Sequence, residues 1–336
     1  MSDSKKIRFG ILGCSRVAHK GVLPAIIGAE SADLTMVGSR SLDKAEETAK
    51  EFDCAKWGTY EDVLKNKEVD AVYISIPPSL HEEWAVKAAQ EGKHVYCEKP
   101  ATVSYDEAKR MVETAQKNKV RLIEGLMFRY HPQNEKVREM IEGGELGEIL
   151  RFNGCFSYDM PDQESNAMSK ELGGGSLYSC GVYPISASRM VFNEEPISVF
   201  AKMRIDSKSK VDIETHVMME FPNNKIAFVS SLFGAYYQSM YEVLGDKAHV
   251  RMKRAYAVPR DWETKMFVDK DDKVTEVIIK PADHFKLMIE DFCDEISKKE
   301  ASTKDYEAEL LAQSRVLEAV KRSSKENRVV NIEEIV

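Results

Sequence analysis

A turn with the pattern of a dinucleotide-binding loop follows the first apolar stretch of the chain. Residues 7–12 run into Gly13-Cys14-Ser15-Arg16-Val17-Ala18. In the pattern G-x-G-x-x-G/A, the three key positions are Gly13, Ser15 and Ala18. The first serves a tight turn, the second the close approach of a pyrophosphate, and the third the packing of helix against strand. The helix that starts at Arg16 and Val17 would direct its N–H groups at the phosphates. Ser15 departs from the pattern, although its hydroxyl can donate to phosphate. We expect a dinucleotide site, the alternative being an ordinary strand–helix turn.

The end of the second apolar stretch, residues 34–37, bears on the choice of cofactor. An NAD site places Asp or Glu about 20 residues beyond the glycine turn, on the ribose 2′-hydroxyl. Here the stretch ends in Gly38-Ser39-Arg40-Ser41, which contains no carboxylate. Two hydroxyls and a guanidinium suit a 2′-phosphate. We therefore expect NADP(H) to be favoured over NAD(H); the alternative is that Arg40 is a solvated turn residue that stacks on adenine.

A third candidate group, Glu98-Lys99-Pro100, ends another apolar stretch. The carboxyl ends of parallel strands line the ligand crevice of an open α/β sheet, so the Lys99 side chain is expected to point into that crevice. Pro100 keeps the Lys99 main chain out of the right-handed helical region and helps to aim the ammonium. In an arbitrary protein, an exposed ion pair between Glu98 and Lys99 would be the better interpretation.

The elements that would position these groups alternate over residues 1–125. Strand candidates occupy 7–12, 34–37, 71–76, 94–97 and 121–124, with helical stretches between them. Two of these helices are predicted to begin with capping boxes, Ser79-x-x-Glu82 and Ser104-x-x-Glu107. The alternation predicts right-handed βαβ crossovers and a Rossmann-type, doubly wound parallel sheet. The fold class expected for this half is α/β.

The alternation of strands and helices ends in the second half of the chain, residues 126–336. A glycine-rich interruption at 173–175 precedes a helix that extends to residue 192. Strand candidates then follow one another at 199–205, 214–221, 225–232, 241–244, 249–252 and 274–279, and helices are expected at about 283–298 and 305–321. Successive strands without helices predict an α+β domain with a large open, mostly antiparallel sheet. The uncovered sheet face predicts a homodimer or homotetramer.

Composition excludes several classes of protein. The 336 residues include 48 Lys and Arg against 56 Asp and Glu, a net charge of −8, so no cationic field is available for nucleic acid. The apolar runs are far shorter than the ~20 residues of a membrane span, and no signal peptide is recognisable. Six scattered cysteines form no CxxC pair. We expect a cytoplasmic protein without a metal site.

Together these motifs resemble those of the Gfo/Idh/MocA oxidoreductases, the family of glucose–fructose oxidoreductase, inositol dehydrogenase and dihydrodiol and pyranose dehydrogenases. The family's markers are a degenerate glycine turn, Glu-Lys-Pro, and a later G-G-G-x-L-x-D-x-G-x-[HY] segment. This chain has Gly173-Gly174-Gly175-Ser176-Leu177-Tyr178-Ser179-Cys180-Gly181-Val182-Tyr183 as the third marker. Two further segments resemble the family beside the nicotinamide and the domain junction: Pro77-Pro78-Ser79-Leu80-His81, and 124–132 with Arg129.

The resemblance implies an oxidoreductase in which hydride passes between a nicotinamide and a sugar, sugar derivative or cyclic polyol or ketone. It places Tyr183 as the general acid/base and Lys99 beside the same substrate oxygen, where a cation lowers the pKa of a phenol. It also implies cofactor contacts by Pro77, His81, Glu98, Lys99 and Arg129. The family's usual Asp is Ser179 here, which implies a substrate-binding hydroxyl without charge.

Two other functions remain open on the same scaffold. One is an NAD-dependent glycosidase, in which the cofactor oxidises and re-reduces the sugar within one turnover. The other is a non-catalytic NADP(H)-binding sensor, motivated by Ser15 and Ser179. The sequence leaves the particular sugar and the reaction direction unassigned.

Overall fold

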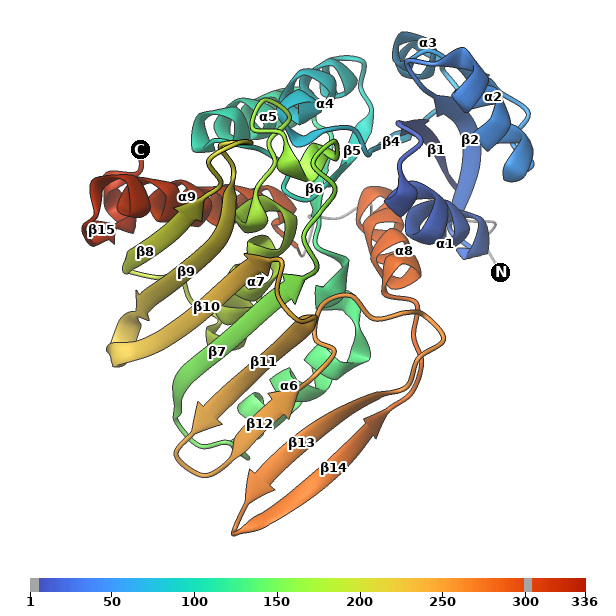
Figure 1. Cartoon of the computed structure of the whole chain (residues 1–336). Coiled ribbons are helices and arrows are strands. Elements are labelled where there is room, and N and C mark those ends of the chain that lie inside the picture. Colours follow the sequence, from blue (N-terminus) through green and yellow to red (C-terminus); the bar gives the residue numbers. More distant parts are fainter. Residues whose placement is uncertain (1–5, 299–303) are drawn as a thin grey trace. The chain divides into compact units, whose positions relative to one another are not determined.

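The computed structural model describes residues 6–298 and 304–336, which divide into two compact units (Figure 1). The first unit comprises residues 1–127 and 285–311, and the second comprises 128–284 and 312–336. Residues 285–311 thus belong to the first unit although they lie near the end of the chain. Each unit has its own sheet and its own buried core.

The first unit is built on a six-stranded parallel sheet of order β3-β2-β1-β4-β5-β6. Its strands are β1 (Ile7–Leu12), β2 (Ala32–Gly38), β3 (Trp57–Gly58), β4 (Ala71–Ile74), β5 (His94–Glu98) and β6 (Leu122–Gly125). The order reverses between β1 and β4. In open α/β sheets a ligand binds at such a switch point, outside the carboxyl ends of the strands.

Helices connect these strands. They are η1 (Ala18–Val22), α1 (Leu23–Gly28), α2 (Leu42–Glu51), α3 (Tyr60–Lys65), η2 (Pro78–Leu80), α4 (His81–Gln90) and α5 (Tyr105–Lys117). The predicted cap of α5 is present, since the Ser104 hydroxyl accepts the N–H of Glu107. The cap predicted at Ser79 is wrong. Ser79 lies inside η2, and α4 begins at His81 without a side-chain cap.

Residues 285–311 join the first unit through β6. They contain most of α8 (His284–Ser297) and the start of α9 (Tyr306–Glu326). The guanidinium of Arg121 donates to both carboxylate oxygens of Glu307, at 3.0 and 3.1 Å, and the N–H of Leu122 donates to the same side chain. These charge-assisted bonds attach a segment far along the chain to the edge strand.

The second unit is built on a nine-stranded sheet of order β14-β13-β12-β11-β7-β10-β9-β8-β15. Its strands are β7 (Ile149–Tyr158), β8 (Ser198–Ile205), β9 (Asp212–Phe221), β10 (Lys225–Phe233), β11 (Gln238–Gly245), β12 (His249–Met252), β13 (Thr264–Lys270), β14 (Lys273–Ile279) and β15 (Val330–Asn331). β7 and β10 run parallel, and the pairs from β11 to β14 are antiparallel. The expected open, mostly antiparallel sheet is confirmed, although β7, β13 and β15 were not predicted.

The remaining helices of the second unit include α6 (Pro132–Glu142) and α7 (Val182–Phe192), and α7 packs against β7. The short turns are η3 (Met127–Tyr130), η4 (Asn166–Met168), η5 (Leu177–Gly181), η6 (Pro222–Asn224) and η7 (Ile332–Glu334). α7 is apolar nearly all round and is buried on almost every side, as such a helix must be.

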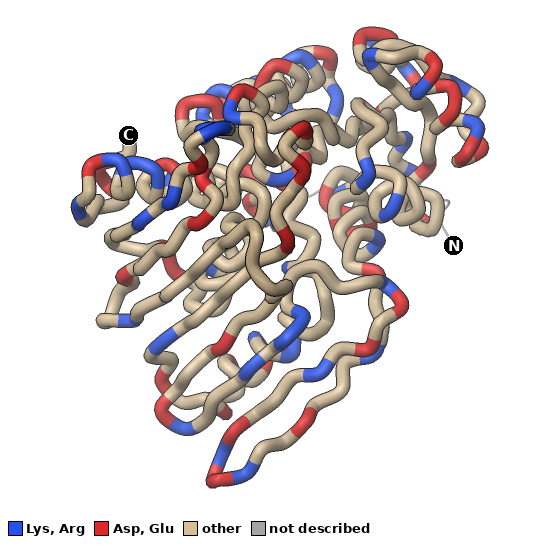
Figure 2. Tube along the Cα trace, viewed as in Figure 1, with Lys and Arg blue, Asp and Glu red and all other residues tan. Residues whose placement is uncertain are grey.

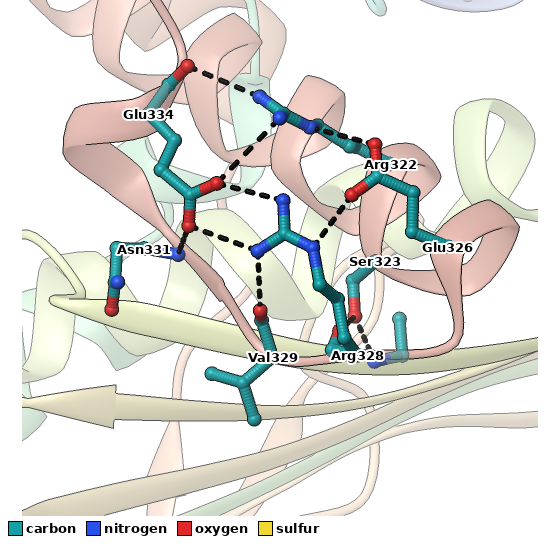
Figure 3. Close-up of polar contacts among 8 residues, drawn as sticks. Arg322, Ser323, Glu326, Arg328, Val329, Asn331 and Glu334 are labelled. Atoms are coloured by element: carbon teal, nitrogen blue, oxygen red, sulfur yellow. Dashed lines mark hydrogen bonds and ion pairs between the residues drawn. The ribbon is translucent and has the colours of Figure 1, made fainter.

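The end of the chain is attached to β8 by a charged network (Figure 3). β15 pairs with β8, and the guanidinium of Arg328 donates to both carboxylate oxygens of Glu334, at 3.1 and 2.7 Å. Arg328 also donates to Glu326 at 2.7 Å, and Glu326 in turn accepts from Arg322 at 3.0 Å. The pKa of Glu334 is lowered to about 2, first by its hydrogen bond with Arg328.

Basic and acidic residues are interspersed over both units (Figure 2). In the described part of the protein, no helix combines the length and the apolar character that a membrane crossing requires.

Candidate active site

The glycine turn follows β1 and contacts Ser75, which follows β4, so it lies at the switch point of the first unit. Gly13 has a φ of +106°, and a Cβ at this position would lie 2.7 Å from the Ser75 carbonyl oxygen. The Ser75 hydroxyl donates to the Gly13 carbonyl at 2.9 Å. Only glycine fits this conformation and this space. Gly13 therefore serves the tight turn that the first position of a dinucleotide-binding loop requires.

Ser15 has a local role that glycine could not supply. Its hydroxyl oxygen accepts the N–H of Ala18 at 3.1 Å, at the start of η1. Such a bond caps a helical start, and the hydroxyl proton is still available as a donor. Arg16 is exposed and Val17 is half-buried. The departure from the glycine pattern thus stabilises the turn.

The three residues after β2 occupy different environments. Ser39 is buried, and its hydroxyl accepts the N–H of Ser41 at 3.2 Å. The Ser41 hydroxyl caps α2 by accepting from the N–H of Lys44. Arg40 is exposed, and its positive charge acts on the phenol of Tyr60, whose pKa is raised by burial. No carboxylate follows β2 before Asp43, in the first turn of α2.

His81 connects the loops that follow β4 and β5. One ring nitrogen lies 2.9 Å from the Pro100 carbonyl oxygen and the other 2.8 Å from that of Ile76. Burial lowers the pKa of His81. Both nitrogens face main chain. His81 therefore positions the Pro77 loop against the Lys99–Pro100 loop.

Glu98 holds the main chain at Lys99. Its carboxylate accepts from the Tyr73 hydroxyl at 2.8 Å and from the N–H of Lys99 at 3.3 Å. Burial raises the pKa of Glu98. The Lys99 side chain is half-buried. Because Glu98 is occupied by internal donors, we assign it to the support of Lys99.

In the second unit, a buried carboxylate anchors the segment that carries Ser179 and Tyr183. Asp212 accepts from the Ser176 hydroxyl and from the N–H of Leu177, both at 2.7 Å. A Cβ on Gly175, whose φ is +119°, would collide with the Asp212 carboxylate. The glycine therefore lets the carboxylate reach the start of η5. η5 is a π-helical turn, a form that is frequent at functional sites.

Tyr183 lies in a group of aromatic rings. Its ring centroid is 5.3 Å from that of Phe156 and 5.8 Å from those of Phe128 and Tyr256. Only 5% of Tyr183 is exposed. The three rings pack around the phenol and hold it in the core of the second unit.

Tyr158, at the end of β7, is a polar neighbour that the sequence analysis did not assign. Its side chain hydrogen-bonds the side chain of Ser179, and burial raises its pKa. Its ring also contacts that of Phe156. Two neutral hydroxyls therefore stand at the position where the resemblance implied a single one. The contact joins residues 21 positions apart, and no local motif marks it.

The remaining predicted residues divide between the units. Arg129 belongs to the second unit, where its guanidinium donates to the Ser186 hydroxyl of α7 at 3.4 Å. The first unit brings together the residues that follow β1, β2, β4 and β5 at one edge of its sheet. The second carries Ser179 on η5 and Tyr183 on α7, and Arg129 contacts α7 through Ser186. Within residues 6–298 and 304–336, no cluster of His, Cys, Asp or Glu has a metal-binding arrangement.

Comparisons with known proteins match both units. The profile of the "Oxidoreductase family, NAD-binding Rossmann fold" matches residues 7–126, and that of the "GFO/IDH/MocA C-terminal domain" matches residues 134–251. A dTDP-3,4-didehydro-2,6-dideoxy-alpha-D-glucose 3-reductase of Saccharopolyspora spinosa is 31% identical over 294 residues, covering 87% of this chain and 88% of the relative. A D-xylose 1-dehydrogenase (NADP(+)) of Haloferax volcanii is 29% identical over 97% of this chain and 99% of the relative.

A solved structure shows the same similarity in three dimensions. The 3-ketoreductase KijD10 of Actinomadura kijaniata, in complex with NADP and TDP-benzene, superimposes with a TM-score of 0.89 at 27% identity. The match covers 95% of this chain and 98% of that enzyme. The predicted family and fold class are thereby confirmed: this chain belongs to the Gfo/Idh/MocA family of oxidoreductases.

Proposed function

We propose that this protein is an NADP(H)-dependent oxidoreductase that transfers a hydride between the nicotinamide and a carbon of a sugar or sugar derivative. The observation that carries the proposal is the Gly13 turn at the switch point, where a φ of +106° and the nearby Ser75 carbonyl oxygen leave room for glycine alone, as the first position of a dinucleotide-binding turn requires. The named relatives support the rest, because they reduce or oxidise sugars and NADP accompanies one of them in its crystal.

The residues of the first unit fit the cofactor. Gly13, Ser15 and the first turn of η1 would hold the pyrophosphate, while Ser39, Arg40 and Ser41 would face the 2′-phosphate. Pro77 and Lys99, on the loops joined by His81, would lie toward the nicotinamide. When it is bound, NADP(H) supplies or accepts the hydride.

The proton is assigned to two side chains, Lys99 of the first unit and Tyr183 of the second. In the direction of reduction, the Tyr183 phenol gives its proton to the substrate oxygen; in oxidation, the phenolate takes it back. The reference pKa of a phenol is ~10, so a nearby cation is required for this role near pH 7. The Lys99 ammonium supplies that charge, and Ser179 with Tyr158 orients a substrate hydroxyl.

The assignment of Tyr183 is tested by Tyr183→Phe. We expect kcat to fall by about 10²–10⁴-fold, with NADPH affinity nearly unchanged, because the ring packing is kept and the proton is lost. Tyr178→Phe is the matched control, since Tyr178 lies on the preceding turn, η5, and its ring faces Lys321. Steady-state kinetics on a sugar substrate, followed by NADPH absorbance, provide the measurement. A Tyr183→Phe enzyme that keeps most of its kcat would remove the phenol from the mechanism.

Lys99 is tested in the same assay. Lys99→Ala should be at least as damaging as Tyr183→Phe, and Lys99→Met should not rescue it, because length without charge cannot stabilise an oxyanion. Ser179→Ala should be milder. The substrate comes from a screen of sugars and nucleotide sugars with both cofactors. Sugar cleavage without net NADPH change would instead indicate a glycosidase, and tight NADPH binding without turnover would indicate a sensor.

A further inference from the structure

The guanidinium of Arg254 faces two aromatic rings in the second unit. Its central carbon lies 4.4 Å from the centroid of the Tyr237 ring and 5.0 Å from that of Trp262. The main chain of Arg254 is also held, because its carbonyl accepts from the Gln133 amide at 2.9 Å and it forms a bridge with Ser239. Cation–π contacts of this kind fix the plane of a guanidinium without using its N–H groups.

Arg254 has no anionic partner in the described part of the chain, where its guanidinium makes neither a hydrogen bond nor an ion pair. The nearby Arg251 differs, since its guanidinium donates to both carboxylate oxygens of Asp269, at 2.8 and 2.9 Å. Asp261 and Glu263 flank Trp262 in sequence, yet neither pairs with Arg254. A half-buried guanidinium therefore keeps five donors for an external anion.

A series of ring contacts leads from Arg254 to the proposed acid/base. Tyr237 contacts Phe156 with centroids 6.1 Å apart, and Phe156 contacts Tyr183 at 5.3 Å. The strand pairing also places Arg254 near Phe156, because Ser239 of β11 pairs with Phe156 on one side and forms a bridge with Arg254 on the other. Arg254 thus lies beside the sheet against which α7, the helix of Tyr183, packs, and all of these residues belong to the second unit.

We propose that Arg254 binds a phosphoryl group carried by the sugar substrate, either as a sugar phosphate or as a nucleoside diphosphate sugar. This inference rests on the proposed function, since it concerns the substrate of the same site. A planar guanidinium matches two phosphate oxygens at once, and charge-assisted bonds of this type are strong. In a chain of net charge −8, an unpaired cation at this place selects an anionic substrate. Trp262, 45% exposed, offers a ring face beside the phosphate.

The test measures binding to the full chain saturated with NADP⁺, by isothermal titration calorimetry. The probes are glucose 1-phosphate and thymidine diphosphate, with glucose and thymidine as their neutral counterparts. We expect a phosphorylated probe to bind more tightly than its neutral counterpart. Arg254→Ala should raise the dissociation constant of that phosphorylated probe by at least about tenfold. Arg254→Lys should retain part of the affinity. Lys253→Ala is the matched control, because Lys253 is an exposed neighbouring cation and its removal should change little.

The outcomes distinguish a sugar phosphate from a nucleotide sugar as the source of the phosphoryl group. They also distinguish failure of the phosphoryl site from failure of the hydride-transfer function. Tighter binding of glucose 1-phosphate indicates a sugar phosphate, and tighter binding of thymidine diphosphate indicates a nucleotide sugar. Equal binding by the unmodified protein and Arg254→Ala, or no binding of either phosphorylated probe, overturns the phosphoryl site. NADPH binding by the unmodified protein is measured in parallel. Its absence contradicts the hydride-transfer function, while an Arg254-dependent probe affinity would still support the phosphoryl site.

Discussion

At the scale of single residues, the cofactor preference depends on the side chains directly after β2. Ser39 is buried beside the backbone of Ser41, whereas Arg40 is exposed at the surface, where it can meet a phosphate. A carboxylate at Ser39 would keep the acceptor for the Ser41 N–H and add a negative charge. That charge would repel a 2′-phosphate and accept from a ribose hydroxyl.

We therefore predict that Ser39→Asp inverts the preference for NADPH over NADH. The ratio of the two dissociation constants should shift by at least about tenfold, given the Coulomb energy of like charges a few ångströms apart. Arg40→Ala should weaken NADPH selectively. Fluorescence titration with both cofactors measures the ratio, and Lys44→Ala serves as a surface control on α2. Binding of NADH by the unmodified protein at least as tight as that of NADPH would refute the assignment.

At the scale of the secondary-structure elements, a buried histidine caps α6. The imidazole of His131 accepts the N–H of Gln133 at 3.3 Å, so the accepting nitrogen must carry no proton. Burial lowers the pKa of His131 to about 4. The ring of His284, 5.8 Å away, has a pKa lowered to about 3, first by burial. Both rings are neutral in the folded protein near pH 7.

The unfolded chain binds protons at these histidines below a pKa of ~6.5. Their contribution to stability is therefore complete above pH ~6.5 and is lost as the pH falls toward the folded pKa values. We predict a loss of about 1 kcal/mol per histidine at pH 5.5 relative to pH 7.5. His131→Asn keeps a capping acceptor and removes one titration, so its free energy of unfolding should depend less steeply on pH. Urea unfolding at both pH values measures this, with His216→Asn, on the exposed side of β9, as the control. An unchanged pH slope in His131→Asn would refute the prediction.

At the scale of the whole molecule, the face of the second sheet that α7 does not cover carries apolar side chains in register. Met218 on β9 pairs with Phe200 on β8 and with Phe228 on β10. Met218 is 39% exposed and Phe228 is 47% exposed. Neighbouring apolar residues on an open sheet face are typical of an interface between subunits.

We predict a homodimer or homotetramer that buries this face. Phe228→Glu should raise the dissociation constant of the assembly by at least about 100-fold, since it removes a buried aromatic ring and adds an unpaired charge. Ile27→Glu, at an exposed apolar position of α1, is the matched control. Sedimentation over a range of concentrations measures the assembly. A monomer at every concentration in the unmodified protein would contradict the prediction.

Features of the first unit that depend on neighbouring residues could be predicted from the sequence. The Gly13 turn, the alternation of strands and helices, and the Ser104 cap each involve contacts within a few positions or a repeated local pattern. The failure at Ser79 is also local, because Pro78 begins a 3-10 turn that delays α4 until His81. The carboxyl-end rule placed Lys99 after β5, since parallel strands deliver their ends to one edge.

Other features were decided only by the tertiary structure. β7 was not predicted because its residues show no strict alternation, and its partners β10 and β11 come far later in the chain. The return of residues 285–311 to the first unit depends on Glu307 meeting Arg121, 186 positions away. Tyr158 beside Ser179, and Arg254 against Tyr237 and Trp262, likewise join separate segments. Local patterns report which face of an element is apolar, whereas the partner of that face is chosen by packing among all elements at once, and no short window of sequence records it.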